Sequence, residues 1–443
     1  MTADPRELAR RVLALAAAGE VQVTVTRTSV AALRFTRALA QEPVVSDELE
    51  VHVLVLRDGH PGAALARGTG EQELATALDE AAAAAASAAA CPTTGSHPGL
   101  TGPQPVRSHD GYDPATARHE AAPAAAAIAA ALAAAGTHDV RGAWTTGLTE
   151  IAIASSTGLD LHDRTTRAVL DVVLRDPGTG REAATRGAGV RAGGFDASDV
   201  VERALLALVP GEPVTIEPGP LEVVLGPEAV AAVLTHLGRT AFDGLAHAEG
   251  RGALAGRLGT RVAASAINLA DSPRFARTLP SAFDLDGVPK APVPLIQDGV
   301  AHRVVHDLCS AARAGGAARS TGHATAPGGG ADGPRPEHLV LIGGGAADVA
   351  ELCVGVDRGL YVGRLAFGSH FGEPIAIATG IARIERGAIV GPADSLRLTA
   401  DPLAILRGVE ALTMAQWLVP HGPRGGIVAP ALRTGGLAVI DAA

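Results

Sequence analysis

The chain has 443 residues, with 37 lysine and arginine residues against 47 aspartate and glutamate residues, so its formal charge at pH 7 is −10. This acidic balance, with only 2% aromatic residues, argues against a nucleic-acid-coating protein, because such proteins present a basic face or stacking aromatics. A hydrophobic content of 47% is typical of a folded chain, and the length suits two or three domains. Three scattered cysteines, no signal peptide and no membrane-spanning apolar stretch predict a soluble cytoplasmic protein: Cys91, Cys309 and Cys353.

The N-terminal half alternates helix and strand signals. Residues 4–7 (DPRE) form a capping box with proline at the first helical position, which predicts a helix that ends near Gly19. Residues 21–26 (VQVTVT) alternate apolar and polar side chains, which indicates a half-buried strand. A turn at Gly158 is expected between two further strands. The remaining predicted elements are strands at 50–57, 144–155 and 168–175, and helices at 71–90, 199–208 and from 114 with an interruption at Pro123.

Residues 209–220 (VPGEPVTIEPGP) are the predicted domain boundary, because four prolines in twelve residues prevent regular structure. We therefore expect an α+β protein. Residues 1–209 form an N-terminal α/β domain of antiparallel strands and Ala-rich helices, and residues 210–443 form a mostly antiparallel β domain shaped like a barrel or sandwich. Within the second domain we expect helices at 227–245 and 403–417, and a long glycine-rich loop at 311–336.

Several isolated motifs have a structural interpretation. The three glycines at 343–345 follow an apolar run without the spacing of a phosphate-binding loop, so they predict a tight turn. His302 and His306 lie in a stretch with strand-like composition, which would place them about 13 Å apart, too far to share one metal. Ser320 and His323 lie close in sequence without a nucleophile elbow, so their loop is expected to contact a ligand or partner. Four metal-type residues without a ligand spacing are interpreted as solvated surface: His109, Asp110, His119 and Glu120.

An ordered series of segments in the second half carries a family resemblance. In this order and content, the sequence resembles the TldD/PmbA (TldE) family of peptidase proteins. The resemblance implies the same division into two domains, and a dimer. The segments are residues 221–273, 283–288 (FDLDGV), 295–300 (LIQDGV), 320–324 (STGHA), 336–341 (PEHLVL) and 381–392 (IARIERGAIVGP).

One departure from the family pattern bears directly on catalysis. The catalytic branch, TldD, carries H-E-x-x-x-H on the helix after the strand, where two histidines bind zinc and the glutamate is the general base. The corresponding residues 236–241 read H-L-G-R-T-A. His236 is retained, but Leu237 cannot take a proton and Ala241 cannot coordinate a metal. The third ligand of the family, a cysteine, falls near His421.

The resemblance therefore implies the PmbA/TldE branch, a non-catalytic subunit of a heteromeric zinc peptidase or amidase. No cofactor is expected in this chain; zinc is expected in a TldD-like partner that carries H-E-x-x-x-H. The pair would act on an extended peptide or a small-molecule amide, without nucleic acid or membrane. The residues expected to contact substrate or partner are Ser320, Thr321, Gly322, His323 and His421.

Two other functions stay open at this point. The chain is an enzyme of a specialised-metabolite pathway if four residues converge on one metal: His236, His247, Glu249 and His421. Alternatively it is a non-enzymatic regulator, as the family's older label of modulator of DNA gyrase implies. The acidic charge disfavours direct contact with DNA but not binding to a protein.

Overall fold

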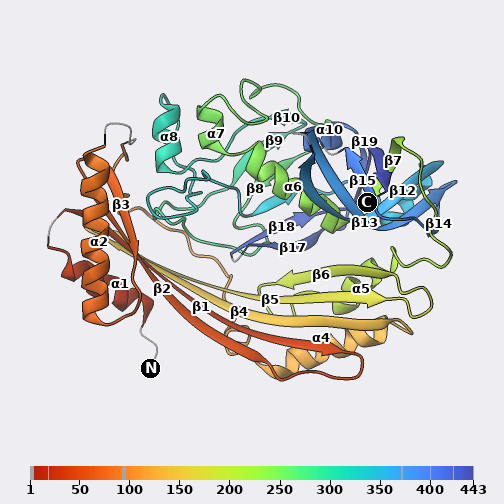
Figure 1. The fold of residues 1–443 in the computed structure, drawn as a ribbon, viewed down its shortest axis with the longest axis horizontal. Helices are drawn as coiled ribbons and strands as arrows, with labels where there is room; N and C mark the ends of the chain where they lie inside the picture. Colours follow the sequence, from red (N-terminus) through yellow and green to blue (C-terminus); the bar gives the residue numbers. More distant parts are fainter. Residues whose placement is uncertain are drawn as a thin grey trace.

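The computed structural model describes residues 4–17, 19–91, 96–370, 373–399, 401–422 and 424–442. A curved sheet of long strands runs beneath a second, β-rich part that contains the C-terminus (Figure 1). The expected α+β class is confirmed. No helix among the described residues has the length and apolar character that crossing a bilayer requires.

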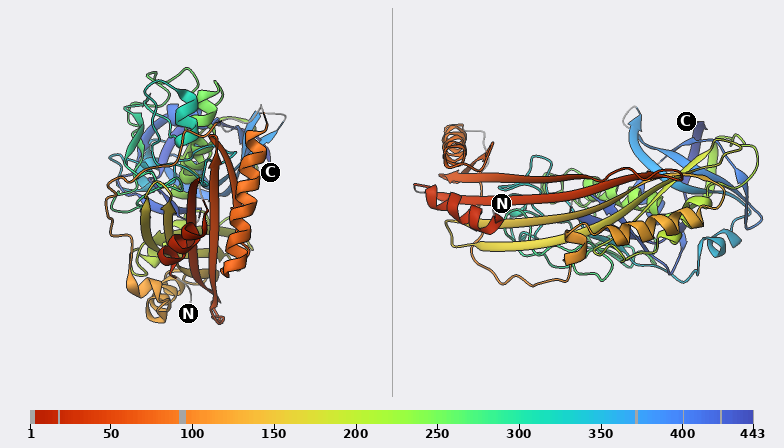
Figure 2. Two further views of the ribbon diagram at one scale, coloured as in Figure 1. Left: turned by 90° about the vertical axis from the view of Figure 1, so that its left-hand side faces the viewer. Right: turned by 90° about the horizontal axis from the view of Figure 1, so that it is seen from below.

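The first sheet is antiparallel throughout, in the order β3-β2-β1-β4-β5-β6. Its strands run along most of the length of the molecule (Figure 2, right). The expected turn at Gly158 joins β4 and β5, and the φ of +88° at that position favours glycine. The strands are β1 (Glu20–Thr36), β2 (Val44–Arg57), β3 (His60–Leu65), β4 (Asp139–Ser155), β5 (Asp160–Arg175) and β6 (Glu182–Gly189).

Helices α1 to α5 accompany the sheet, and α2 packs closely on it through several alanines besides Leu74 and Leu78. Helix α2 approaches β3 so closely that a Cβ on Gly62 would lie 2.1 Å from the backbone nitrogen of Ala85, which only glycine avoids. Pro123 falls in the first turn of α4, so the expected interruption is a restart after α3. The helices are α1 (Pro5–Leu15), α2 (Glu71–Ala89), α3 (Pro114–Ala117), α4 (Ala121–Ala134) and α5 (Ala197–Leu205).

The second half contains a closed barrel, which confirms the expected barrel architecture. In the described residues, five strands pair in the ring β12-β7-β19-β15-β13, and β13 pairs back with β12. All pairs are antiparallel except β7 with β12. The strands are β7 (Gly219–Leu225), β12 (Arg358–His370), β13 (Glu373–Glu385), β15 (Leu396–Thr399) and β19 (Leu432–Ala442), with β14 (Ala388–Pro392) and β16 (Val409–Leu412) at the side.

A third sheet lies beside the barrel in the order β10-β9-β8-β11-β18-β17. Helix α6 (Pro227–Thr240) contacts both β12 of the barrel and β18 of this sheet, so the main apolar core surrounds it. The strands are β8 (Leu269–Asp271), β9 (Val293–Gln297), β10 (Val300–Ala301), β11 (Leu339–Leu341), β17 (Trp417–His421) and β18 (Gly425–Ala429). The short helices are α7 (Gly244–Ala248), α8 (Leu308–Ala314), α9 (Val349–Val354) and α10 (Pro402–Arg407).

Three expected elements end earlier than predicted. The helix expected at 227–245 ends at Thr240, and Asp243 caps α7 separately. The helix expected at 403–417 ends at Arg407, because Gly408 lies against the backbone of Gly436 in β19 and the chain continues as β16. In the strand-like stretch that contains His302 and His306, residues 299–308, only β10 forms a strand. Residues 209–218 contain no helix or strand beyond one bridge from Val214 to Ala393, and the domain boundary stays a prediction.

Candidate functional site

Helix α6 places the three positions at which the resemblance predicts an altered zinc motif in different surroundings. The imidazole of His236 stacks on Phe367 of β12, with ring centroids 4.7 Å apart at an interplanar angle of 21°. Burial lowers the pKa of His236, and nearby Arg239 lowers it further, so the ring is neutral at pH 7. Leu237 is 1% exposed and Ala241 3% exposed, both within the apolar core.

These residues do not fit a catalytic zinc ion, which takes three nitrogen, sulfur or oxygen ligands from the protein. Positions 237 and 241 carry no donor atom, and the imidazole at 236 lies on an aromatic ring. Among the described residues, no group of three or more histidine, cysteine, aspartate or glutamate side chains is placed to hold a metal ion.

The other proposed metal ligands have separate surroundings. Glu249 is paired with Arg251 and, at 3.2 Å, with Arg313, so two guanidinium groups neutralise its carboxylate. His247 lies on α7, and its buried Nδ1 has no hydrogen-bond partner within the described residues. His421 ends β17, where burial lowers its pKa. The sharing of one metal by these residues and His236 therefore has no support from their placement.

The central residues of the loop that is expected to contact substrate are buried. The side chain of His323 is fully buried, with Nε2 3.2 Å from Oδ1 of Asp271. Its Nδ1 lies 2.9 Å from the hydroxyl of Thr321. Gly322 is also buried, with φ at +78°. Gly322 and His323 are therefore buried in this structure, whereas Ser320 and Thr321 stay partly exposed, and contact of this loop with substrate stays a prediction.

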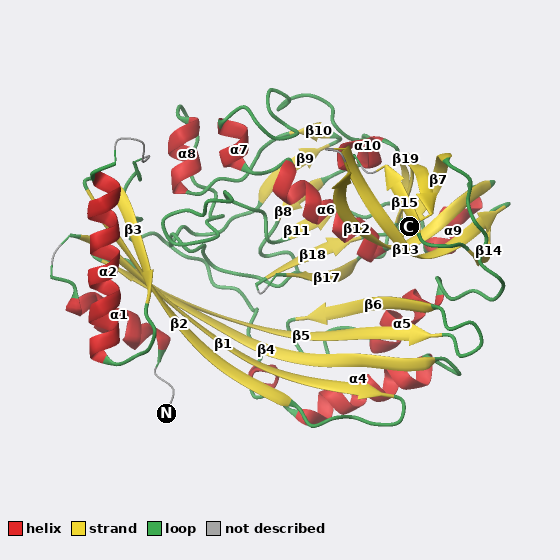
Figure 3. Cartoon of the chain, viewed as in Figure 1, coloured by secondary structure: helices red, strands yellow, loops and turns green. Residues whose placement is uncertain are grey.

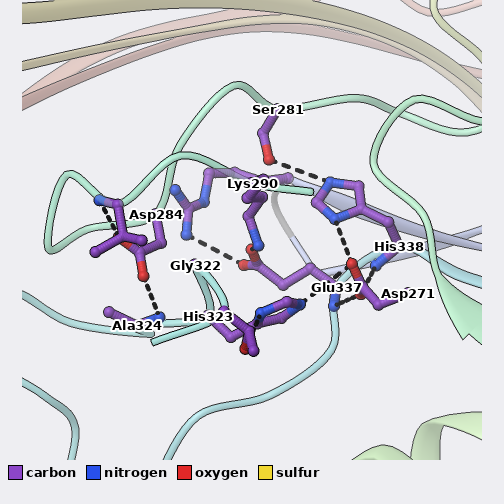
Figure 4. A network of polar contacts seen from close by, with 12 residues as sticks. Asp271, Ser281, Asp284, Lys290, Gly322, His323, Ala324, Glu337 and His338 are labelled. Atoms are coloured by element: carbon purple, nitrogen blue, oxygen red, sulfur yellow. Dashed lines mark hydrogen bonds and ion pairs between the residues drawn. The ribbon is translucent and has the colours of Figure 1, made fainter. Parts of the chain in front are cut away.

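The partner of His323 is the centre of a buried polar network (Figure 4). Oδ2 of Asp271 accepts hydrogen bonds from the backbone N–H groups of Glu337 and His338, both at 2.8 Å. Nε2 of His338 lies 3.3 Å from the hydroxyl of Ser281. Burial raises the pKa of Asp271, but the two histidines outweigh it and hold that pKa well below its usual range.

Beside it lies a buried ion-pair chain that contains Lys290, the single lysine of the sequence. Nζ of Lys290 is 3.0 Å from Oε2 of Glu337, and Nη2 of Arg424 is 3.1 Å from Oε1. Burial opposes ionisation of Glu337, but Arg424 and Lys290 lower its pKa well below its ordinary value. Two cations thus share one carboxylate, which compensates the loss of hydration of all three.

A third part of the network joins two segments of the family resemblance. Oδ1 of Asp284 accepts hydrogen bonds from the N–H groups of Asp286 and Val288, and Oδ2 accepts one from Ala324. Burial raises the pKa of Asp284 to about 6. Burial and the neighbouring Asp284 raise the pKa of Asp286 well above its ordinary value; its Oδ1 accepts the N–H of Gly328. Carboxylates therefore fix loops that have no helix or strand (Figure 3).

The chemistry of this network is structural. Ser281, His338 and Asp271 are the residue types of a serine nucleophile. However, Nδ1 of His338 is 3.7 Å from Oδ1 of Asp271, beyond hydrogen-bond distance, and Ser281 is 5% exposed. The cysteines are no better as nucleophiles: burial raises the pKa of Cys309 to about 12 and that of Cys353 to about 11. The network therefore holds together segments that are distant in sequence.

Sequence reasoning missed this network and misplaced two histidines. The sequence did contain a signal for the network, because most of its residues come from three segments that carry the family resemblance: 283–288, 320–324 and 336–341. The prediction of a solvated surface is wrong for His109, whose largely buried ring lies 2.9 Å from Asp163. His119 contacts the hydroxyls of Ser29 and Thr146. His306 is also buried and lies outside β10, so the strand expected around it is wrong.

Family models account for most of the chain. The PmbA/TldA metallopeptidase central domain matches residues 114–208, and the PmbA/TldA metallopeptidase C-terminal domain matches residues 218–441. The chain belongs to the PmbA/TldD family. The expected family resemblance is thereby confirmed. A comparison with curated proteins found no match.

Solved structures share this PmbA/TldD fold over nearly the whole chain. TldE from Thermococcus kodakarensis is 20% identical, with a TM-score of 0.80 and coverage of 98% of this chain and 99% of that one. A protein from Thermotoga maritima described as a modulator of a DNA gyrase is 19% identical, with the same TM-score and coverage. A similarly described protein from Bacteroides thetaiotaomicron is 16% identical, with a TM-score of 0.78 and full coverage of both chains.

Proposed function

We propose that this chain is the non-catalytic, TldE-type subunit of a heteromeric zinc peptidase or amidase. Its partner is a TldD-like chain that carries H-E-x-x-x-H and holds the zinc ion. The substrate is an extended peptide or a small-molecule amide, cleaved at the partner's metal. The family membership and the fold shared with Thermococcus TldE support this assignment.

The observation that carries the proposal is the face of α6 at positions 237 and 241. In a catalytic subunit these positions need a carboxylate and an imidazole that reach a metal from the helix surface. Here both side chains are apolar and belong to the core that joins the barrel to the third sheet. A polar pair at these positions would lose hydration without gaining a partner. The packing of the fold therefore favours apolar side chains at positions 237 and 241, whereas a zinc site would need polar ones.

The test is a comparison of the chain alone with the chain copurified with a TldD-like protein from the same organism. Bound zinc is measured by mass spectrometry, and hydrolysis is measured on an unstructured peptide and on a small amide. We expect no stoichiometric zinc and no turnover for the chain alone, and both for the complex. A partner whose motif glutamate is replaced by glutamine is the matched control and should bind this chain without turnover.

Zinc and turnover in the isolated chain would contradict the proposal. Stable binding to DNA gyrase, with no complex formed with the TldD-like protein, would favour a regulatory role instead.

A further inference from the structure

A cleft of about 640 Å³ lies at the junction between the first sheet and the third sheet. Strands β6 and β17, the end strands of these two sheets, each contribute residues to its lining. The segment 274–280 and the start of α5 also contribute residues to the lining. Its volume lies in the range of about 300–1,000 Å³ that is usual for small-molecule sites.

One wall of the cleft is cationic. Arg274 donates from Nη1 and Nη2 to the backbone carbonyls of Lys290 (2.7 Å) and Arg107 (2.9 Å). Arg277 donates from Nη1 to the carbonyl of Gln416 at 3.5 Å. Within the described part of the chain, neither guanidinium forms an ion pair with a carboxylate. Backbone carbonyls thus orient two charges and leave them uncompensated.

The start of α5 contributes carboxylates to the lining. Oδ1 of Asp196 caps the helix by accepting the N–H of Ser198 at 2.8 Å, which leaves its other oxygen available. Asp199 accepts the indole N–H of Trp417 at 2.7 Å and lies 3.4 Å from Arg203. Further charged residues of the lining are Asp110 and Arg191, the latter 4.0 Å from Asp113 outside the cleft.

Other residues of the lining are apolar. Phe195, Phe275 and Trp417 supply aromatic surface, and Leu418 supplies aliphatic surface. The hydrogen bond to Asp199 fixes the indole of Trp417, and Phe195 stacks on the buried Trp144 at 5.9 Å. Rigid aromatic surface of this kind binds an apolar side chain with little loss of conformational entropy.

We infer that this cleft binds a short peptide with free termini and an apolar side chain. Its carboxylate lies at Arg274 and Arg277, and its ammonium group lies at Asp196 and Asp199. The apolar side chain packs against Phe195, Phe275 and Trp417. Charge-assisted hydrogen bonds to both termini distinguish such a peptide from an internal segment of a long chain. The inference stands on the cleft alone and does not require the proposed function.

The test is calorimetric titration of the isolated full-length chain with Ala-Leu-Ala. The same peptide is also titrated with its N-terminus acetylated and, separately, with its C-terminus amidated. We expect binding of the free peptide, and about tenfold weaker binding on blocking either end, from the strength of charge-assisted hydrogen bonds. In Arg277→Gln the preference for the acid over the amide should become smaller, with Arg274 remaining. In Asp196→Asn, which retains a helix cap, the preference for the free over the acetylated peptide should become smaller, with Asp199 remaining.

Arg319→Gln is the matched control, because Arg319 is an exposed arginine that also donates only to backbone carbonyls. It should leave all three titrations unchanged. The inference is wrong if the free peptide does not bind at millimolar concentration, if blocking its ends changes nothing, or if Arg277→Gln retains the full preference for the acid. These outcomes involve neither zinc nor a partner, so they are distinct from failure of the proposed function.

Discussion

Two buried regions of the second half differ in polarity: one is apolar, and the other contains charged side chains. On α6, Leu237 and Ala241 lie where the resemblance predicts the glutamate and the histidine of the catalytic branch, and both pack in an apolar core. Around Asp271, in contrast, charged side chains are buried just as deeply but are paired with ions or backbone donors. Buried charge persists in this fold where partners surround it, as for Glu228 of α6 beside Arg203, whereas Leu237 and Ala241 lie among apolar side chains.

The largest expected effect is that of Asp271→Ala. It would leave two buried histidines and the N–H groups of Glu337 and His338 without their acceptor. Breaking a buried charged network in this way costs about 3–5 kcal/mol, which we expect as a loss of unfolding free energy in urea. Asp79→Ala, at an exposed position of α2, should change it by less than about 0.5 kcal/mol. A loss below about 1 kcal/mol for Asp271→Ala would remove the network's structural role.

Introducing the zinc-binding residue types at positions 237 and 241 tests the apolar region on α6. The double variant Leu237→Glu, Ala241→His should lose about 3 kcal/mol of unfolding free energy, because it places unpaired polar groups in the core, and should bind no stoichiometric zinc. Arg239→Glu introduces the same carboxylate at an exposed position of α6 and should be tolerated. A stable double variant that binds zinc would show that this face of α6 can pack in the core and also hold a metal ion.

Variants of Lys290 and Glu337 test how strongly these two buried side chains interact. Lys290→Met should destabilise the fold by about 2–3 kcal/mol, because Glu337 loses one of its two cations. Adding Glu337→Gln should not recover that loss, because Arg424 then loses the carboxylate with which it pairs. The two single variants and the double variant form a thermodynamic cycle, and strict additivity would show that Lys290 and Glu337 do not interact.

The smallest expected effect is a pH dependence. Burial lowers the pKa of His323 below 6.5, so the unfolded chain takes up its proton first and stability falls as the pH drops below about 6.5. Asp284 acts in the opposite sense. Its pKa is raised to about 6, so its contribution is full below 3.8 and is lost as the pH rises through 6. The urea midpoint at pH 5.5 relative to that at pH 7.5 should therefore be higher in His323→Gln than in the wild type, whereas His52→Gln at a more exposed position should leave this difference unchanged.

The sequence by itself determined the elements whose signals are local. The cap at Asp4, the alternation that makes β1, the turn at Gly158 and the restart near Pro123 all follow from neighbouring residues. The family and the absence of zinc donors at positions 237 and 241 were also readable, because they depend on residue identity and order alone.

Only the tertiary structure decided which loop residues face inward. Loops have no periodicity that predicts side-chain direction, so the burial of His323 depends on Asp271, 52 positions earlier in the chain. The end of α10 is likewise set by the approach of Gly408 to Gly436. The cleft joins walls from residues near 196 and 277, which no local pattern relates. Contacts between distant segments form only when the whole core packs, and so they leave little trace in any one stretch of sequence.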